Sequence, residues 1–227
     1  MSELLEISDL TGSTANKKVL KNISFCLKSG SLLAIVGANG GGKSSLAQVL
    51  MGNPDYQIDR GRVLIDGQEL HGLTVDERAR LGLYVAWQNP VSIPGVTVFS
   101  LCKAAYEANG HIIKKLVEFK KLLEDLAVSV GLTLAHVARF VNDGFSGGEK
   151  KRLELLQLLL LKPKLVVLDE IDSGLDQDGR ALIVKVVKEL RDGGTGLIVI
   201  SHYEQLISEL KPNVVMEMAN GQLQPRV

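Results

Sequence analysis

The chain has 227 residues, a hydrophobic share of 45%, and 26 basic residues that balance 26 acidic ones. A chain of this length can bury a sizeable core, and its zero formal charge gives no overall field that would attract nucleic acid or an anionic membrane. Residues 1–10 lack the basic and apolar regions of a signal peptide, and no run of roughly 18 apolar residues follows. We therefore expect a cytoplasmic protein without direct membrane insertion and without a nucleic-acid partner.

The first third of the chain predicts strands. Residues 4–10 and 19–27 alternate apolar and polar side chains, as half-buried antiparallel strands do. A short apolar run at 31–36 leads into a glycine-rich loop, and a helical pattern over 43–51 follows that loop. Residues 61–66 predict one more strand, which ends in a turn.

The middle of the chain, from about residue 89 to 160, has mostly helical patterns and few strand signals. Its clearest amphipathic helix has apolar residues at three- and four-residue spacing, namely Leu116, Val117, Phe119, Leu122, Leu123 and Leu126. In the last third, the apolar runs 165–168 and 197–200 are typical of strands covered on both faces, and a helical pattern over 178–191 separates them. This order predicts an α/β fold with a parallel sheet and a helical insertion.

A phosphate-binding loop is predicted at residues 37–44 (GANGGGKS), which match G-x-x-x-x-G-K-[ST], the Walker A pattern. Glycines let several backbone N–H groups point inward at phosphate oxygens, and the following helix adds the positive end of its dipole. Lys43 can reach the β- and γ-phosphates, and the Ser44 hydroxyl can bind Mg²⁺. The position between a predicted strand and a predicted helix makes this interpretation stronger than that of a flexible glycine turn.

Two acids, Asp169 and Glu170, follow the apolar strand 165–168. Charges at the end of a buried strand are costly unless they have a function. Together with a phosphate loop, they predict a carboxylate on the Mg²⁺ side, Asp169, and a general base that orients the attacking water, Glu170.

A second anion site is predicted at residues 146–149 (SGGE), which open a long helical pattern. Ser146 can hydrogen-bond a phosphate, and the N–H groups of Gly147 and Gly148 lie at the start of the helix. One nucleotide does not need two such sites on one chain. Two chains that face each other do, because each can offer its second site to the ATP of the other.

The motifs above resemble those of the ABC (ATP-binding cassette) ATPases, and residues 146–149 look like a variant of the LSGGQ signature motif of that family. Gln88 stands where the Q-loop glutamine falls, residues 173–176 (SGLD) resemble the D-loop, and His202 resembles the switch histidine. These motifs stand in the same order as in the family, and the resemblance covers nearly the whole chain.

This resemblance implies an ABC ATPase core, with a RecA-like parallel sheet and an antiparallel β subdomain, plus an inserted helical subdomain. The core would span 1–88 and 161–227, and the helical subdomain 89–160. The implied cofactors are ATP and Mg²⁺, and the implied assembly is an ATP-dependent head-to-tail dimer in which Gln88 couples the nucleotide to a partner subunit.

The motifs and the resemblance together define three sets of site residues. The catalytic set is Lys43, Glu170 and His202. The nucleotide-binding set is Gly37, Asn39, Gly40, Gly42, Lys43, Ser44, Ser45, Gln88, Ser146, Gly147, Gly148, Glu149 and Asp176, and the metal-binding set is Ser44, Gln88 and Asp169.

Within that family, four segments resemble the SufC group, the ATPases of the SufBCD iron–sulfur cluster assembly machine. They are residues 84–96 (YVAWQNPVSIPGV), 139–152 (RFVNDGFSGGEKKR), 169–176 (DEIDSGLD) and 201–212, which begins SHY. This likeness implies SufB- and SufD-like scaffold proteins as partners, bound through the Q-loop and the helical insertion. The chain departs from the group at Gly41 and Ser45, where serine and threonine are usual, and residues 9–19 offer no aromatic side chain to stack on adenine.

Two alternatives remain open. The nucleotide-binding subunit of an ABC membrane transporter would have every one of these catalytic residues, although residues 171–172 replace the usual proline. A non-catalytic, ATP-gated interaction module would not need Glu170 and His202.

The cysteines, the remaining histidines and two lysine pairs are expected to be structural or surface residues. Cys26 and Cys102 have no ligand spacing, and we expect two buried thiols in a reducing compartment. His71, His111 and His136 are interpreted as surface or packing residues. The lysine pairs at 114–115 and 120–121 are expected on a solvated helix face.

Overall fold

The computed structural model describes residues 3–15 and 17–226, and its chain divides into two compact units. Unit 1 comprises residues 1–86, 163–171 and 187–227, and unit 2 comprises 87–162 and 172–186. Residues 172–186, which the sequence analysis places in the core, cluster with unit 2.

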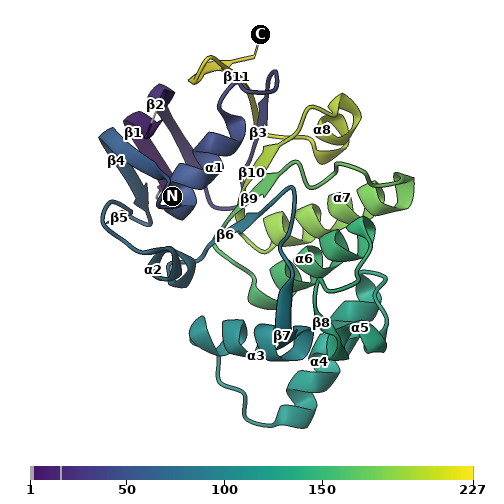
Figure 1. Ribbon diagram of the computed structural model, residues 1–227. Coiled ribbons are helices and arrows are strands. Elements are labelled where there is room, and N and C mark those ends of the chain that lie inside the picture. The colour runs from purple at the N-terminus through teal and green to yellow at the C-terminus, as the bar shows by residue number, and fades with distance from the viewer. Residues whose placement is uncertain (1–2, 16, 227) are drawn as a thin grey trace. The chain divides into compact units, whose positions relative to one another are not determined.

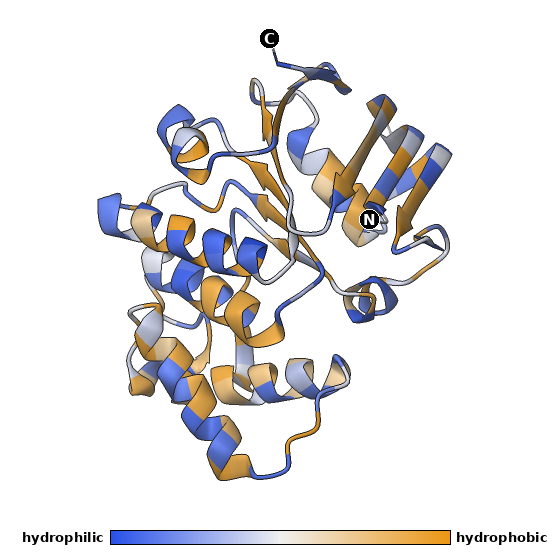
Figure 2. Cartoon of the chain, turned by 180° about the vertical axis from the view of Figure 1, so that it is seen from behind, coloured by the Kyte–Doolittle hydropathy of each residue, from blue (hydrophilic) through white to orange (hydrophobic). Residues whose placement is uncertain are grey.

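Unit 1 contains a six-stranded sheet in the order β12-β11-β3-β10-β9-β6. Its three central strands, β3 (Leu32–Val36), β10 (Gly196–Ile200) and β9 (Leu165–Asp169), are parallel and buried along their whole length. Continuous apolar sequence is what strands covered on both faces require, and Figure 2 shows these strands in the hydrophobic colour. The fold is therefore of the α/β class, as predicted.

The edges of this sheet are β6 (Leu83–Ala86) on one side and β11 (Val214–Ala219) with β12 (Gln222–Pro225) on the other. β6 and β11 are parallel to their neighbours, whereas β12 pairs antiparallel with β11 through a tight turn. Because the central strands are parallel, their carboxyl ends meet at one edge of the sheet, and loops that follow β3, β9 and β10 converge there (Figure 1).

A second sheet of unit 1 is antiparallel, in the order β2-β1-β4-β5. Its strands are β1 (Glu3–Thr14), β2 (Lys17–Lys28), β4 (Tyr56–Ile65) and β5 (Gln68–Glu69). Helices α1 (Lys43–Met51), α2 (Val75–Arg80) and α8 (Glu204–Leu210) complete the unit, together with the end of α7 (Gln177–Asp192). The predicted parallel sheet, antiparallel strands and first helix are confirmed.

Unit 2 is mostly helical and contains α3 (Val98–Ala108), α4 (Leu116–Ser129), α5 (Leu134–Ala138) and α6 (Gly147–Leu161). It also contains a two-stranded ribbon, β7 (Ile93–Thr97) with β8 (Phe140–Val141), which the sequence analysis missed. On α4 the expected apolar face is only partly covered: Phe119 and Leu123 are buried, whereas Leu116 and Val117 are exposed.

Among the described residues, no helix is long and apolar enough to cross a membrane. The two cysteines differ. Cys102 is buried, as expected, but Cys26 is exposed, so the prediction of two buried thiols is wrong for Cys26. Its position explains this, because it alternates along β2 with the buried Leu27 and so points to the other face of the strand.

Candidate functional site

The phosphate loop of unit 1 begins where β3 ends, and it closes at the first residue of α1. Gly37 has a φ angle of 134° and Gly42, the N-cap of α1, has 112°, both in the region that favours glycine. A Cβ atom at Gly37 would lie 2.2 Å from the carbonyl oxygen of Met218 on β11. The loop therefore depends on glycine both for its backbone conformation and for its contact with the sheet.

Gly41, at which the chain departs from the SufC pattern, has a similar constraint. A Cβ atom there would lie 2.7 Å from the same Met218 oxygen, and the Gly41 carbonyl accepts a hydrogen bond from the N–H of Gly221. A serine side chain would need the β11 backbone at Met218 to move. The close approach of that strand thus explains why glycine suits this chain.

Lys43 opens α1, and its side chain folds over the loop that precedes it. The residue is 4% exposed, and Nζ donates to the carbonyl oxygens of Gly37 at 2.7 Å and Ala38 at 3.1 Å. The first turn of α1, residues 43–46 (KSSL), carries no acid to offset the helix dipole. An ammonium group, a helix N-terminus and a glycine loop together form a site for an anion of phosphate type.

Ser44 and Asp169 lie next to each other at the edge of the sheet. The Ser44 hydroxyl donates to Oδ1 of Asp169 at 3.1 Å, and Asp169 is 3% exposed. Burial raises the pKa of the Asp169 carboxyl and the neighbouring Glu170 charge adds to this, whereas the Ser44 hydrogen bond and the Lys43 charge oppose it. A divalent cation here would be held by hydroxyl and carboxylate oxygens, the ligands that Mg²⁺ prefers.

Glu170 and His202 form the second pair at this edge. His202 Nδ1 lies 3.7 Å from Glu170 Oε1, and the side chains are 60% and 13% exposed respectively. Glu170 has a φ angle of 51°, unusual for a non-glycine residue, and its N–H donates to the Ile200 carbonyl of the neighbouring strand. Such strained residues are typical of active sites. A carboxylate beside an imidazole can orient a water molecule and accept its proton.

Ser201 connects His202 to the sheet. It is fully buried, its N–H donates to the Ile35 carbonyl of β3, and its hydroxyl accepts from the N–H of Tyr203. These bonds fix the backbone on both sides of His202. Unit 1 thus brings together the predicted phosphate loop, with Asn39, Gly40 and Ser45 on or beside it, and the predicted Asp169, Glu170 and His202.

No group of three or more His, Cys, Asp or Glu side chains is placed to hold a metal ion within the described residues. The predicted metal set contains one acid, Asp169, with a serine and a glutamine. A cation here would therefore take its remaining ligands from phosphate oxygens and water, as magnesium commonly does. The Ser44 and Asp169 oxygens of unit 1 fit a nucleotide-bound Mg²⁺ and do not fit a tightly held structural metal.

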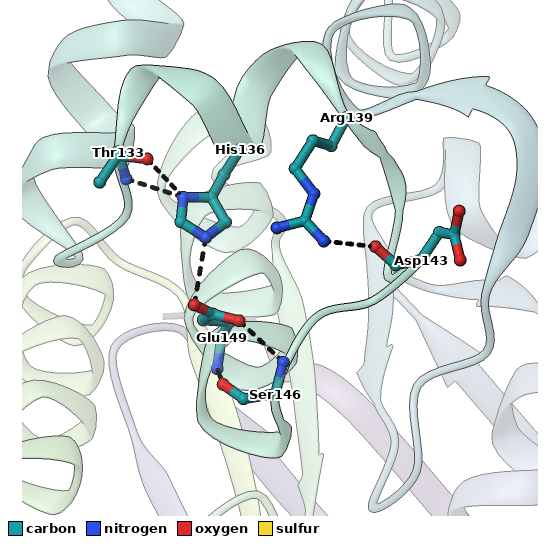
Figure 3. Close-up of polar contacts among 6 residues, drawn as sticks. All are labelled: Thr133, His136, Arg139, Asp143, Ser146 and Glu149. Carbon is teal, nitrogen blue, oxygen red and sulfur yellow. Dashed lines mark hydrogen bonds and ion pairs between the residues drawn. The ribbon is translucent and has the colours of Figure 1, made fainter.

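The predicted second anion site lies in unit 2, at the start of α6. Ser146 is the N-cap: its Oγ accepts from the N–H of Glu149 at 3.3 Å, and its own N–H donates to Glu149 Oε2 at 2.7 Å (Figure 3). This reciprocal capping box leaves the Ser146 hydroxyl proton and the Gly147 and Gly148 N–H groups at the helix start for an anion. Ser146 and Gly147 are exposed.

The Glu149 carboxyl has its pKa lowered, first by the Ser146 N–H, then by the Ser146 side chain and, to a smaller extent, by His136. His136 is a packing residue, which is one of the two interpretations that the sequence allowed: its side chain is 13% exposed and its ring meets Phe145 edge to face. The contact of its Nε2 with Glu149 Oε1, at 3.2 Å, was not predicted. No sequence signal links the two, because they come from different elements 13 positions apart.

Gln88 and Asp176, the other predicted nucleotide-binding residues, also belong to unit 2. Gln88 is exposed, while the preceding N–H, that of Trp87, donates to Glu154 Oε1 on α6 at 3.1 Å. Asp176 Oδ1 accepts from the N–H of Gly179 at 2.8 Å and so caps the start of α7.

Glu154 is a buried acid that the sequence analysis missed. It is 5% exposed, and its Oε2 has no hydrogen-bond partner among the described residues. Burial raises the pKa of its carboxyl to about 8, although the Trp87 N–H and the Lys151 charge oppose this shift. Its only sequence signal is one acid within the apolar run of α6.

Comparison with known proteins gives one consistent result. Residues 20–173 match the family model described as ABC transporter. A probable ABC transporter ATP-binding protein of Streptococcus pyogenes serotype M18 is 43% identical over 97% of this chain and 87% of its own length. A probable ATP-dependent transporter of Synechocystis is 38% identical over 97% and 88%, and vegetative protein 296 of Bacillus subtilis is 37% identical over 96% and 85%.

Solved structures agree on the fold. The ATP-binding subunit of an ABC transporter superposes with a TM-score of 0.83 at 25% identity, over 97% of this chain and 88% of that chain. A bacterial ABC transporter cassette, solved as a dimer, superposes with a TM-score of 0.81 at 19% identity, over 96% of both chains.

Proposed function

Because the chain belongs to the ABC family of ATP-binding cassettes, we propose that it hydrolyses ATP as a head-to-tail dimer of two identical subunits. The carboxyl edge of the parallel sheet carries this proposal. There the Ser44–Asp169 hydrogen bond of 3.1 Å and the Glu170–His202 approach of 3.7 Å place two acid-containing pairs beside the phosphate loop. One pair suits a metal ion and the other suits the attacking water.

In this proposal the phosphate loop holds the β- and γ-phosphates through its N–H groups and Lys43. The Lys43 amine exchanges its present partners, the loop carbonyls of Gly37 and Ala38, for phosphate oxygens. Ser44 and Asp169, with Gln88 as the sequence motif implies, would hold Mg²⁺, which, when bound, would neutralise charge on the phosphates. Asn39, Gly40, Gly42 and Ser45 complete the nucleotide contacts.

Glu170 orients a water molecule and accepts one of its protons as the water oxygen attacks the γ-phosphorus. The bond from that phosphorus to the β–γ bridging oxygen breaks, and ADP leaves with the electron pair. His202 is exposed enough to reach the γ-phosphate, while Ser201 keeps its backbone fixed. The 3.7 Å approach lets the histidine hold the Glu170 carboxylate as the proton is transferred.

The second anion site supports the dimer. Ser146, Gly147 and Gly148 would contact the γ-phosphate bound by the partner subunit, with Glu149 closing the capping box behind them. Asp176, at the start of α7, would face the same interface. A Ser146→Arg change should therefore block the ATP-dependent dimer and leave ATP binding by the single chain intact.

For the partner, we propose SufB- and SufD-like scaffold proteins that the ATP-driven dimer moves during iron–sulfur cluster assembly. The support is the likeness of segments 84–96, 139–152, 169–176 and 201–212 to the SufC group. A second candidate, the nucleotide-binding subunit of an ABC membrane transporter, is favoured by the Streptococcus and Synechocystis relatives, both of which are named as probable transporter proteins.

The test is to tag the chain in its native host, extract with mild detergent and identify what co-purifies. Soluble SufB- and SufD-like proteins would support the first candidate, and their absence beside a polytopic membrane protein would refute it. As a control, the tagged Glu170→Gln protein should retain the same partners while its ATP turnover falls to background. Equal turnover in both proteins would contradict the assignment of Glu170 as the base.

A further inference from the structure

The second anion site contains an acid, Glu149, whose role rests on the proposed function. Glu149 is the third residue of α6, in the same turn as the groups proposed to contact the γ-phosphate of the partner subunit. Its lowered pKa means that it is ionised at neutral pH. A full negative charge in the first turn opposes the approach of a phosphate that the helix N-terminus would otherwise attract.

His136 lies against this carboxylate from α5 (Figure 3). Its Nε2 is 3.2 Å from Glu149 Oε1, while Glu149 Oε2 accepts from the N–H of Ser146 at 2.7 Å. Both carboxylate oxygens are therefore engaged, one by each element. The Ser146 side chain also lowers the pKa of this carboxyl, so the Ser146 hydroxyl and His136 both stabilise the Glu149 carboxylate. The His136 contact leaves a donor on Oε1 when the hydroxyl proton turns to an incoming phosphate.

The hydrogen bonds on the other side of the ring assign the proton of His136. Its Nδ1 lies 3.1 Å from the N–H of Thr133, which can only donate, and 2.7 Å from the Thr133 hydroxyl. Nδ1 is therefore the acceptor, and the neutral ring carries its proton on Nε2, directed at Glu149. This is the tautomer that can donate to the carboxylate.

Packing fixes the ring in place. Phe145, the residue before the N-cap of α6, meets the His136 ring edge to face at 5.1 Å between centroids. The guanidinium of Arg139 lies over the Phe145 ring at 4.8 Å and is anchored by a bond to the Asp143 carbonyl (Figure 3). The side chain of His136 is 13% exposed, so its bond to Glu149 is only partly open to competition from water.

We propose that His136 is a positioning residue for the second anion site. His136 holds the Glu149 carboxylate and disperses its charge, so that Ser146 can donate to the γ-phosphate of the partner subunit. It touches no nucleotide itself. The phosphate loop belongs to unit 1 and His136 to unit 2, so a change at His136 should not alter ATP binding by the single chain. Its effect should appear in the step that joins two subunits around ATP.

The experiment compares His136→Leu, which removes the donor, with His136→Gln, whose amide N–H can still reach Glu149. Both are made in the Glu170→Gln chain, and the dissociation constant of the ATP-bound dimer is measured by sedimentation. We expect His136→Leu to raise that constant about tenfold, the loss of one hydrogen bond to a charged group, and His136→Gln to stay within about twofold. ATP binding by the single chain should not change.

A second background isolates the charge. In a Glu149→Gln chain there is no carboxylate to offset, so His136→Leu should change the dimer constant by less than about twofold. Equal impairment by Leu and Gln at position 136, persisting in the Glu149→Gln background, would show a packing role and overturn the proposal.

A separate readout needs no dimer. Nitrogen-15 chemical shifts of the His136 ring in the full-length single chain should show the proton on Nε2, and a proton on Nδ1 would overturn the inference by itself. A parent chain that binds ATP without dimerising, yet shows the Nε2 tautomer, would instead refute the proposed function together with the role given to His136.

Discussion

The buried acid Glu154 should make the stability of the protein fall as pH rises. Its carboxyl is 5% exposed, one oxygen is unpaired among the described residues, and burial raises its pKa from 4.5 to about 8. The unfolded chain releases this proton near pH 4.5, whereas the folded chain keeps it until about pH 8. Between these two pKa values the folded state therefore binds more protons than the unfolded chain. The stability that this proton contributes is fully present below pH 4.5 and is lost as the pH rises to about 8.

The magnitude follows from linkage, at about 1.4 kcal/mol per pH unit for one proton. Integrated from pH 5 to pH 8 with these two pKa values, the loss is on the order of 3.5 kcal/mol. Glu154→Gln keeps the acceptor for the Trp87 N–H and nearly the same volume but cannot ionise. The unfolding free energy of the Glu154→Gln variant should therefore not show this loss between pH 5 and pH 8.

The assay is urea unfolding of both proteins, followed by far-ultraviolet circular dichroism at half-unit steps of pH. We expect the difference in unfolding free energy, the Glu154→Gln variant minus wild type, to grow as pH rises and to level off above about pH 8. A difference that stays constant across this range would refute a raised pKa at Glu154. A difference that grows toward low pH would show that the carboxylate is stabilised in the folded protein.

Three further predictions concern single residues. Gly37→Ala should lower the free energy of thermal or urea unfolding by about 3 kcal/mol, because its Cβ would lie 2.2 Å from the Met218 oxygen. Gly40→Ala, whose Cβ meets no atom within 4 Å, should lower it by about 1 kcal/mol. Equal losses in the two variants would contradict the contact of Gly37 with Met218. Lys43→Ala should weaken ATP binding about 100-fold by calorimetry. Lys120→Ala, on the solvated face of α4, should bind ATP with unchanged affinity. Tight ATP binding by the Lys43→Ala variant would exclude the phosphate-loop assignment. Cys26, which is exposed, should react with a thiol reagent in the folded protein. Cys102, which is buried and has its pKa raised to about 12, should react only on unfolding. A fast phase of the thiol reaction that remains in the Cys26→Ser variant would contradict this prediction.

Local sequence predicted the elements whose signals are local. Helix α1 begins and ends at the predicted residues, Lys43 and Met51, because a glycine loop precedes it and Gly52 ends it in a left-handed conformation. The strands β3, β9 and β10 were found because each is a continuous apolar run. The residues beside the phosphate loop were predictable because acids and a histidine directly follow such strands.

Features that depend on distant pairing were not predicted. The ribbon of β7 and β8 joins residues such as Ile93 and Val141, which carry no mutual signal in one sequence. The β11–β12 hairpin was also missed, although Asn220 and Gly221 at its turn are a recognised hairpin signal. The contact of His136 with Glu149 likewise depends on how α5 packs beside α6, which a motif cannot show.

The proposed head-to-tail dimer, with ATP at both phosphate loops, can be checked by the mass of the Glu170→Gln chain in solution. Light scattering with Mg²⁺ and ATP should give twice the mass of the single 24.6 kDa chain, and the mass should return to that of the single chain when ADP replaces ATP. A protein that binds ATP tightly and keeps the mass of one chain would contradict the proposed dimer.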